Sequence, residues 1–191
     1  MVKVALNILL TMMLTSVQGF AADGASGHDY FTANENPGIQ HYLYKVDNAH
    51  TNKVLGSIHA ERLNVAIGDL KYTLARFPNH PKALSLLKTV AQLTKNSALG
   101  IAYYERAIKL YPQYALTHAQ YGDYLVAIGQ LEAGIEKLLM STEMDNKLVF
   151  AYVGLAKAYY RRGDLEHAKR AAAEARALNY KGKIPAEVAG E

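Results

Sequence analysis

The fold is decided by one stretch of sequence, Tyr103-Tyr104-Glu105-Arg106-Ala107-Ile108-Lys109-Leu110-Tyr111-Pro112. It has the pattern of a helix that stops at its proline, because proline lacks a backbone N–H and ends helices. Steps of 34 residues from Ala107 reach three more small residues, Thr73, Ser141 and Ala175. A second column, seven positions earlier, holds Ala66, Gly100, Gly134 and Ala168. Small residues in fixed columns at a fixed period predict a tandem array of one structural unit.

Helix packing explains why these columns are small. Where two helices cross closely, a side chain larger than a methyl group would push the two backbones apart. A third column holds Gly122 and Ala156, extends to Val54 and is broken by Lys88. The columns therefore predict helices that cross one another at regular intervals.

The breaks between helices are periodic as well. Gly129 and Gly163 can adopt the left-handed conformation that ends a helix, so each marks a turn within one unit. Pro78 and Pro112 stop the second helix of a unit. Period, columns and turns together resemble the tetratricopeptide repeat (TPR), a helix–turn–helix unit of 34 residues. The resemblance covers residues 47–182 and implies an all-α TPR solenoid.

The expected repeats occupy residues 47–80, 81–114, 115–148 and 149–182. The first repeat is weak, since Lys53 stands where an apolar residue is expected and Glu61-Arg62 where glycine is usual. Three repeats preceded by an irregular helical cap are the alternative. The turn-forming residues 22–38 predict no regular structure, within an irregular segment 22–46 that runs into the first helix. Residues 183–191 are expected to be a tail.

Residues 1–21 have the pattern of a secretory signal peptide. Lys3 precedes a mostly apolar run from Val4 to Val17, and Gly19-Phe20-Ala21 offers small residues where a signal peptidase cuts. A retained membrane anchor is the alternative, although the apolar run is shorter than the roughly 20 residues of a spanning helix. We expect an exported protein of the bacterial periplasm, with no integral membrane span after cleavage.

Short segments add a narrower resemblance, to exported bacterial TPR proteins of no assigned role. They are Asp29-Tyr30, Val46-Asp47-Asn48-Ala49-His50 and Arg76-Phe77-Pro78-Asn79-His80-Pro81. This resemblance supports the envelope location and implies no activity.

Composition excludes several classes of function. The formal charge is +4 and falls to +3 when Lys3 is removed with the leader, which is too weak and too dispersed to indicate nucleic acid as a partner. The chain has no cysteine, so apolar packing must hold the fold without disulfides. We find no catalytic constellation, no cofactor motif and no metal site, and we expect no enzyme. His80 is expected to cap the helix that begins at Pro81.

The chain contains fourteen tyrosines and no tryptophan. The core columns of the repeat account for four of them, Tyr104, Tyr121, Tyr152 and Tyr159. Tyr124 and Tyr160 fall outside these columns. A groove that binds a partner is the functional explanation for so many tyrosines, because tyrosine combines a large apolar body with a polar tip.

The resemblance implies that the first helix of each repeat lines a concave groove. The expected lining is Asn48, Thr51, Leu55, Ile58, His59, Lys82, Ser85, Thr89, Gln92, Leu93, Leu116, Ala119, Asp123, Val126, Ala127, Phe150, Val153, Lys157, Tyr160 and Arg161. The residues selected for partner binding are Phe150, Lys157, Tyr160, Arg161, Asp123, Gln92 and Asn48. Chaperone-binding arrays grip a C-terminal carboxylate with a basic clamp, but Thr51 and Leu55 occupy its first two places here.

The function expected from these features is protein binding in the cell envelope, by a scaffold or assembly factor that grips a segment of another protein. A non-catalytic regulatory subunit of an envelope or cell-wall enzyme is the alternative. For the fourth repeat, the alternative to a binding site is that Lys157 and Arg161 form a solvated helix face.

Overall fold

The computed structural model describes residues 27–185. The expected leader 1–21, residues 22–26 and residues 186–191 of the expected tail lie outside the described residues. Within 27–185 the chain has no strand and forms η1 (Ala33–Glu35), α1 (Pro37–Ala49), η2 (Thr51–Lys53), α2 (Val54–His59), α3 (Leu63–Arg76), α4 (Pro81–Leu93), α5 (Ala98–Leu110), α6 (Ala115–Ala127), α7 (Leu131–Met144), α8 (Val149–Arg162) and α9 (Leu165–Ala177). The predicted all-α TPR-like solenoid is confirmed.

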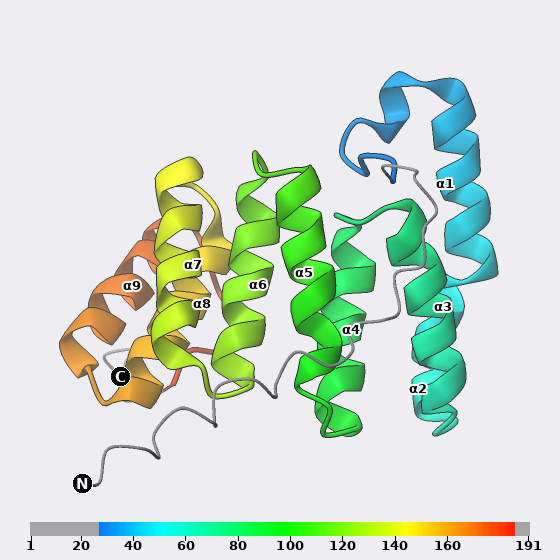
Figure 1. Cartoon of the computed structure of the whole chain (residues 1–191). Coiled ribbons are helices and arrows are strands. Elements are labelled where there is room, and N and C mark those ends of the chain that lie inside the picture. Colours follow the sequence, from blue (N-terminus) through cyan, green and yellow to red (C-terminus); the bar gives the residue numbers. More distant parts are fainter. Residues whose placement is uncertain (1–26, 186–191) are drawn as a thin grey trace, which may run out of the picture.

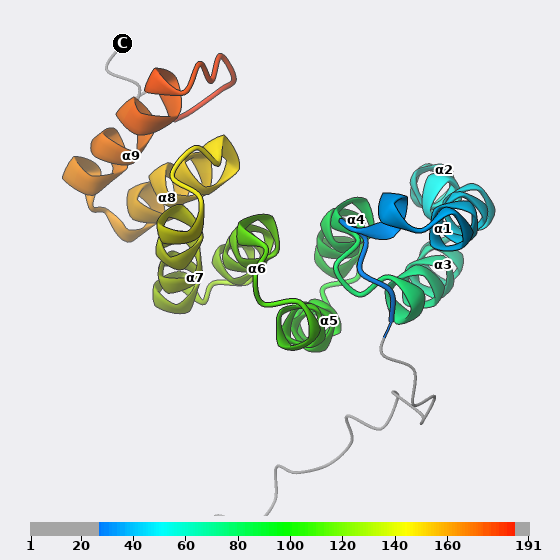
Figure 2. The ribbon, with the colours of Figure 1, turned by 90° about the horizontal axis from the view of Figure 1, so that it is seen from above.

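The helices stand side by side in an array that runs from α1 at one end to α9 at the other (Figure 1). Seen from above, the array is an arc with α4, α6 and α8 on its inner side and α3, α5 and α7 on its outer side (Figure 2). Within residues 27–185, no helix combines the length and the apolar character needed to cross a membrane. The arc gives the molecule a concave face built from the first helices of successive pairs.

Local sequence sets the helix ends. Pro81 opens α4 at a position where no backbone N–H is required, and the His80 ring accepts a hydrogen bond from the Ala83 N–H. The predicted capping role of His80 is therefore confirmed. Gly129 and Gly163 have φ angles of +90° and +81°, as the turn between two helices of a pair requires.

The small-residue columns lie at helix crossings. Members of both columns are buried, from Ala66 and Thr73 in α3 to Ala168 and Ala175 in α9. At the α6–α7 crossing, a Cβ atom added to Gly134 would lie 2.8 Å from the Gly122 carbonyl oxygen. A Cβ atom added to Gly122 would likewise lie 2.8 Å from the Gly134 carbonyl oxygen. Two glycines thus let the backbones of α6 and α7 touch.

The first helical pair is irregular. Its first helix is divided, because α1 ends at Ala49, His50 leaves the helical conformation, and η2 and the short α2 follow. Thr51, just after the break, is fully buried and its hydroxyl lies 3.0 Å from that of Thr73 in α3. Since the Thr73 hydroxyl already donates to the Asp69 carbonyl, Thr51 is the donor of this bond. The break in the helix at His50 therefore lets Thr51 form a buried hydrogen bond with α3.

The prediction that residues 22–38 are unstructured is wrong for the part that the structure describes. Residues 27–36, here named the N-terminal strap, cross the ends of the first and second helical pairs, at the loops after α3 and α5, before α1 begins at Pro37. Their backbone is held by the His28 N–H, which donates to the Arg76 carbonyl at 2.6 Å, and by the Tyr111 hydroxyl, which donates to the Gly27 carbonyl.

Asp29 is the centre of the strap. One carboxylate oxygen accepts from the Asn79 amide at 2.6 Å and the other from the Tyr114 hydroxyl at 2.5 Å. The Asn79 side chain also accepts from the Tyr30 N–H at 2.9 Å, and Phe31 stacks on Tyr114 with ring centroids 4.3 Å apart. The strap thus joins the loop after α3 to the loop after α5, which stiffens the N-terminal half of the arc.

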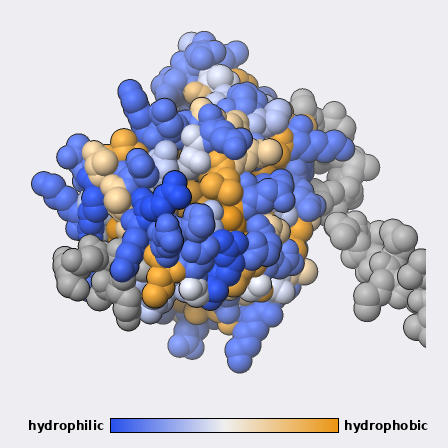
Figure 3. All heavy atoms as spheres, turned by 90° about the vertical axis from the view of Figure 1, so that its left-hand side faces the viewer, coloured by the Kyte–Doolittle hydropathy of each residue, from blue (hydrophilic) through white to orange (hydrophobic). Residues whose placement is uncertain are grey.

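Most of the core of the described residues lies in two apolar clusters that meet in α6, and a smaller third cluster holds Ala33, Val46 and Phe77. Tyr121 and Leu125 belong to the cluster shared with α2–α5, and Ala119 and Val126 to the cluster shared with α7–α9. Ile184, 8% exposed, packs on the second cluster. Figure 3 looks onto the α9 end of the array, where hydrophilic side chains cover most of the face and hydrophobic ones appear in small patches. Such a polar end is what a terminal helix of a repeat array needs in water.

Candidate binding groove

A pocket of about 370 Å³ lies on the inner side of the arc, where α4, α6 and α8 come together. It is lined by Lys88, Gln92, Asp123, Val126, Ala127, Lys157, Tyr160, Arg161 and Pro185. We call it the groove pocket. Three successive inner helices contribute to it, so its shape depends on the curvature of the array.

Lys88 and Asp123 form an ion pair between α4 and α6, with each side chain about one quarter exposed. Lys88 occupies the position of the third small-residue column that Gly122 and Ala156 hold in the next two repeats. It is tolerated there because its ammonium group reaches Asp123 on the neighbouring inner helix. Burial, followed by the Asp123 charge, raises the pKa of Tyr104 well above its ordinary value, so that phenol stays neutral and donates to the Leu84 carbonyl.

The α8 side of the pocket is basic. Arg161 donates from Nη1 to the Val126 carbonyl at 3.0 Å, which fixes its guanidinium group across the end of α6. Lys157 lies one turn earlier on α8, is exposed, and pairs with no carboxylate among residues 27–185. In the described part of the pocket, three cations therefore face the single carboxylate of Asp123.

The groove pocket brings together five of the seven residues selected from the sequence, Gln92, Asp123, Lys157, Tyr160 and Arg161. Phe150 does not line it. That ring is 40% exposed at the first turn of α8, and ten residues separate it from Tyr160, which is roughly 15 Å along a helix. Asn48 does not line it either, since it lies at the end of α1.

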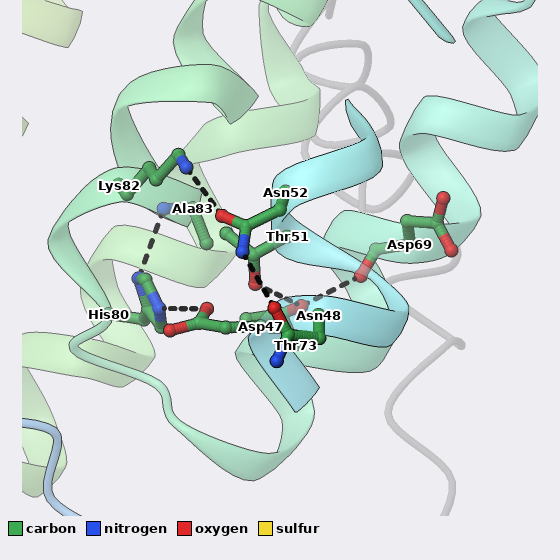
Figure 4. A network of polar contacts seen from close by, with 9 residues as sticks. All are labelled: Asp47, Asn48, Thr51, Asn52, Asp69, Thr73, His80, Lys82 and Ala83. Atoms are coloured by element: carbon green, nitrogen blue, oxygen red, sulfur yellow. Dashed lines mark hydrogen bonds and ion pairs between the residues drawn. The ribbon is translucent and has the colours of Figure 1, made fainter. Parts of the chain in front are cut away.

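Asn48 belongs instead to a polar network between α1, η2, α3 and the start of α4 (Figure 4). Its side-chain oxygen accepts from the Asn52 amide at 3.4 Å, and Asn52 accepts from the Lys82 ammonium at 2.7 Å. In the same region His80 Nε2 lies 2.8 Å from Asp47. Because His80 Nδ1 accepts from a backbone N–H, the proton is on Nε2 and is donated to Asp47.

Among the described residues, no three His, Cys, Asp or Glu side chains gather as a metal would require.

Several residues expected to line the groove are buried instead. Thr51 and Ala119 are fully buried and Val153 is 8% exposed, because the broken first helix and the packing of α6 and α8 turn them into the core. The sequence reasoning missed two residues of the pocket, Lys88 and Pro185. The signal for Lys88 was its position as a charge in a column of small residues. Pro185 had no signal, since it follows the last repeat.

Tyr124, which the core columns of the repeat leave unassigned, belongs to the core. Tyr124 is fully buried, and its hydroxyl donates to the Ser97 carbonyl at 2.6 Å and accepts from the Gly100 N–H at 3.1 Å. A Cβ atom on residue 100 would meet the Tyr124 ring at 2.5 Å. Tyr124 therefore fills the space that Gly100 leaves, and only Tyr160 of the two unassigned tyrosines lines the groove pocket.

No family model matches the chain. A TPR repeat-containing protein of Methanocaldococcus jannaschii is 26% identical over 110 residues, a match that spans 49% of this chain and 19% of that protein. PilF of Pseudomonas aeruginosa has a similar structure, with a TM-score of 0.56 and 19% identity over 72% of this chain and 63% of that chain.

YrrB, described as a TPR protein with an unusual peptide-binding site, is also similar in structure. Its TM-score is 0.50, with 18% identity over 78% of this chain and 80% of that chain. At these identities the likeness to PilF and YrrB shows the fold. Solenoids of this fold present extended concave surfaces to other proteins. The 34-residue columns, the paired helices and these likenesses together show that the chain has the tetratricopeptide-repeat fold.

Proposed function

We propose that this chain is an exported, non-catalytic binding module that acts as a scaffold or assembly factor for another cell-envelope protein. The observation that carries the proposal is the groove pocket, in which α4 and α8 present cations beside the apolar wall of α6 on a concave surface. A concave site between helices, where polar groups converge beside an apolar wall, is a usual place for ligand recognition.

The frame around the pocket is rigid. Gly122 and Gly134 hold α6 against α7, Lys88 ties α4 to Asp123, and Arg161 ties α8 to the end of α6. A partner that enters the groove therefore meets Lys88, Asp123 and Arg161 in positions that internal contacts already hold, which lowers the entropic cost of binding.

The chemistry of the pocket favours binding over catalysis. Among its described lining residues the carboxylate is Asp123, and the ion pair with Lys88 already engages it, so the described lining holds no second carboxylate or His with which it could form an acid–base pair. The proposal of export rests on the leader pattern of residues 1–21, and N-terminal sequencing of the mature protein tests it: a start at Ala22 supports export, and a start at Met1 in the membrane fraction contradicts it.

The binding proposal is tested by cross-linking in whole cells, followed by affinity purification and quantitative mass spectrometry. Lys157→Glu with Arg161→Glu reverses the charge of the pocket, and we expect it to remove the envelope proteins captured by the wild type. The control is Lys169→Glu with Arg170→Glu, which makes the same charge change on exposed residues of α9. The proposal fails if both double variants capture the same proteins as the wild type.

A further inference from the structure

We infer that the groove pocket is a receptor for a carboxylate side chain, carried by an extended acidic segment of the partner. The inference rests on the proposed function only in taking the partner to be a protein. It follows from the charge, the anchoring, the size and the walls of the pocket.

Charge is the first argument. Lys157 and Arg161 are four residues apart on α8, so they are neighbours on one helix face, where like charges repel. No acidic side chain of residues 27–185 pairs with Lys157, and Asp123 is engaged by Lys88. Within the part of the chain that the structure describes, two adjacent cations on a concave surface thus lack an anion, and a partner carboxylate would supply it.

Anchoring is the second argument. Arg161 uses Nη1 to hold the Val126 carbonyl, so the plane of its guanidinium group is fixed before a ligand arrives. A guanidinium group has five N–H donors, and its remaining donors can face a carboxylate in the forked geometry that suits the group. Lys157, on the adjoining turn, adds a mobile charge that can reach the second carboxylate oxygen.

Size is the third argument. The pocket has a volume of about 370 Å³. It can therefore take a carboxylate side chain together with a neighbouring side chain of an extended segment.

The walls specify what lies beside the carboxylate. Val126, Ala127 and Pro185 form the apolar part of the lining, and Gln92 and Tyr160 supply polar groups around it. An aliphatic residue next to the acidic residue would cover the apolar wall, and the Gln92 amide can bond to the peptide backbone. The partner segment is therefore expected to combine one Glu or Asp with a neighbouring Val or Leu.

The test uses the mature chain and two end-blocked synthetic peptides, acetyl-Gly-Val-Glu-Leu-Gly-amide and the same peptide with Gln in place of Glu. Binding is followed by two-dimensional ¹H–¹⁵N NMR titration at 50 and 500 mM salt. We expect the Glu peptide to shift amide signals of α4, α6 and α8, with a Kd at least about tenfold lower than that of the Gln peptide, because the charge-assisted bonds are lost with Gln. The difference should shrink at high salt.

Variants give a second readout. Lys157→Gln and Arg161→Gln should each weaken binding of the Glu peptide about tenfold, and the control Lys169→Gln on α9 should leave it unchanged. The inference is overturned if the Glu and Gln peptides bind equally, if the shifts lie outside α4, α6 and α8, or if a phosphoserine peptide binds more tightly than the Glu peptide. Failure of the envelope proposal is separate, because peptide binding in vitro does not depend on which proteins are captured in cells.

Discussion

Replacement of Gly134 by alanine probes the contact on which the curvature of the inner face depends. An alanine Cβ at position 134 would lie 2.6 Å from Val126 Cγ2, 2.8 Å from the Gly122 carbonyl oxygen and 3.0 Å from the Val126 backbone nitrogen. Two of these three neighbours are backbone atoms, which no rotamer change can move. The methyl group can fit only if α6 and α7 separate.

The magnitude follows from two opposing effects. Alanine stabilises a helix interior by about 1 kcal/mol relative to glycine. Overpacking at a tight contact typically costs ~1–3 kcal/mol. The matched control is Gly68→Ala in α3, where an added Cβ meets nothing within 4 Å and only the helix effect remains. We therefore expect the free energy of unfolding of Gly134→Ala to lie ~1–3 kcal/mol below that of Gly68→Ala.

The assay is urea unfolding followed by circular dichroism at neutral pH. A linear dependence of the free energy on urea gives each variant a value, and the slopes should agree if the denatured states are alike. The reasoning is refuted if Gly134→Ala is stabilised as much as Gly68→Ala, since the backbones of α6 and α7 would then not be in contact.

Two further predictions concern pH and the strap. Burial, opposed by Asp47, lowers the pKa of His80. The unfolded chain therefore binds a proton more readily below about pH 6.5, and the free energy of unfolding should fall as the pH falls through this value. In His80→Asn, whose amide can still cap α4, this pH dependence should be weaker in urea titrations at pH 5.5 and 7.5. In the strap, Asp29→Ala removes the acceptor of Asn79 and Tyr114 and should cost ~1–3 kcal/mol in urea unfolding, whereas Glu35→Ala should cost less than 0.5 kcal/mol, the usual size of an exposed surface change.

The periodic part of the fold could be predicted from the sequence because the same packing requirement recurs in each repeat. Ala107 and Gly134 are small for one reason, the close crossing of two helices, and the 34-residue spacing makes that reason visible. Five of the candidate site residues lie together for the same cause, since residues at corresponding places on successive first helices face the same concavity. Whether they bind a partner stays a prediction.

The features that the sequence did not indicate depend on contacts that do not recur at the 34-residue spacing. Asp29 meets Tyr114 across 85 residues of sequence, and nothing in the turn-rich composition of the strap indicates such a partner. Tyr124 is buried because Gly100 on another helix leaves room for its ring, a pairing that neither position reveals alone. Phe150 was selected for its place on the α8 stripe, but a stripe does not say how far along the helix the pocket extends.

The central claim is that a partner occupies the inner side of the arc at the groove pocket. The most direct test places a photo-cross-linking amino acid at position 92 in living cells and compares it with the same amino acid at position 109. Gln92 is exposed on α4 and lines the pocket, whereas Lys109 is exposed on α5, on the outer side of the arc. The account predicts a discrete cross-linked product of higher mass from position 92 and none from position 109. Cross-links from position 109 alone, or the same products from both positions, would contradict it.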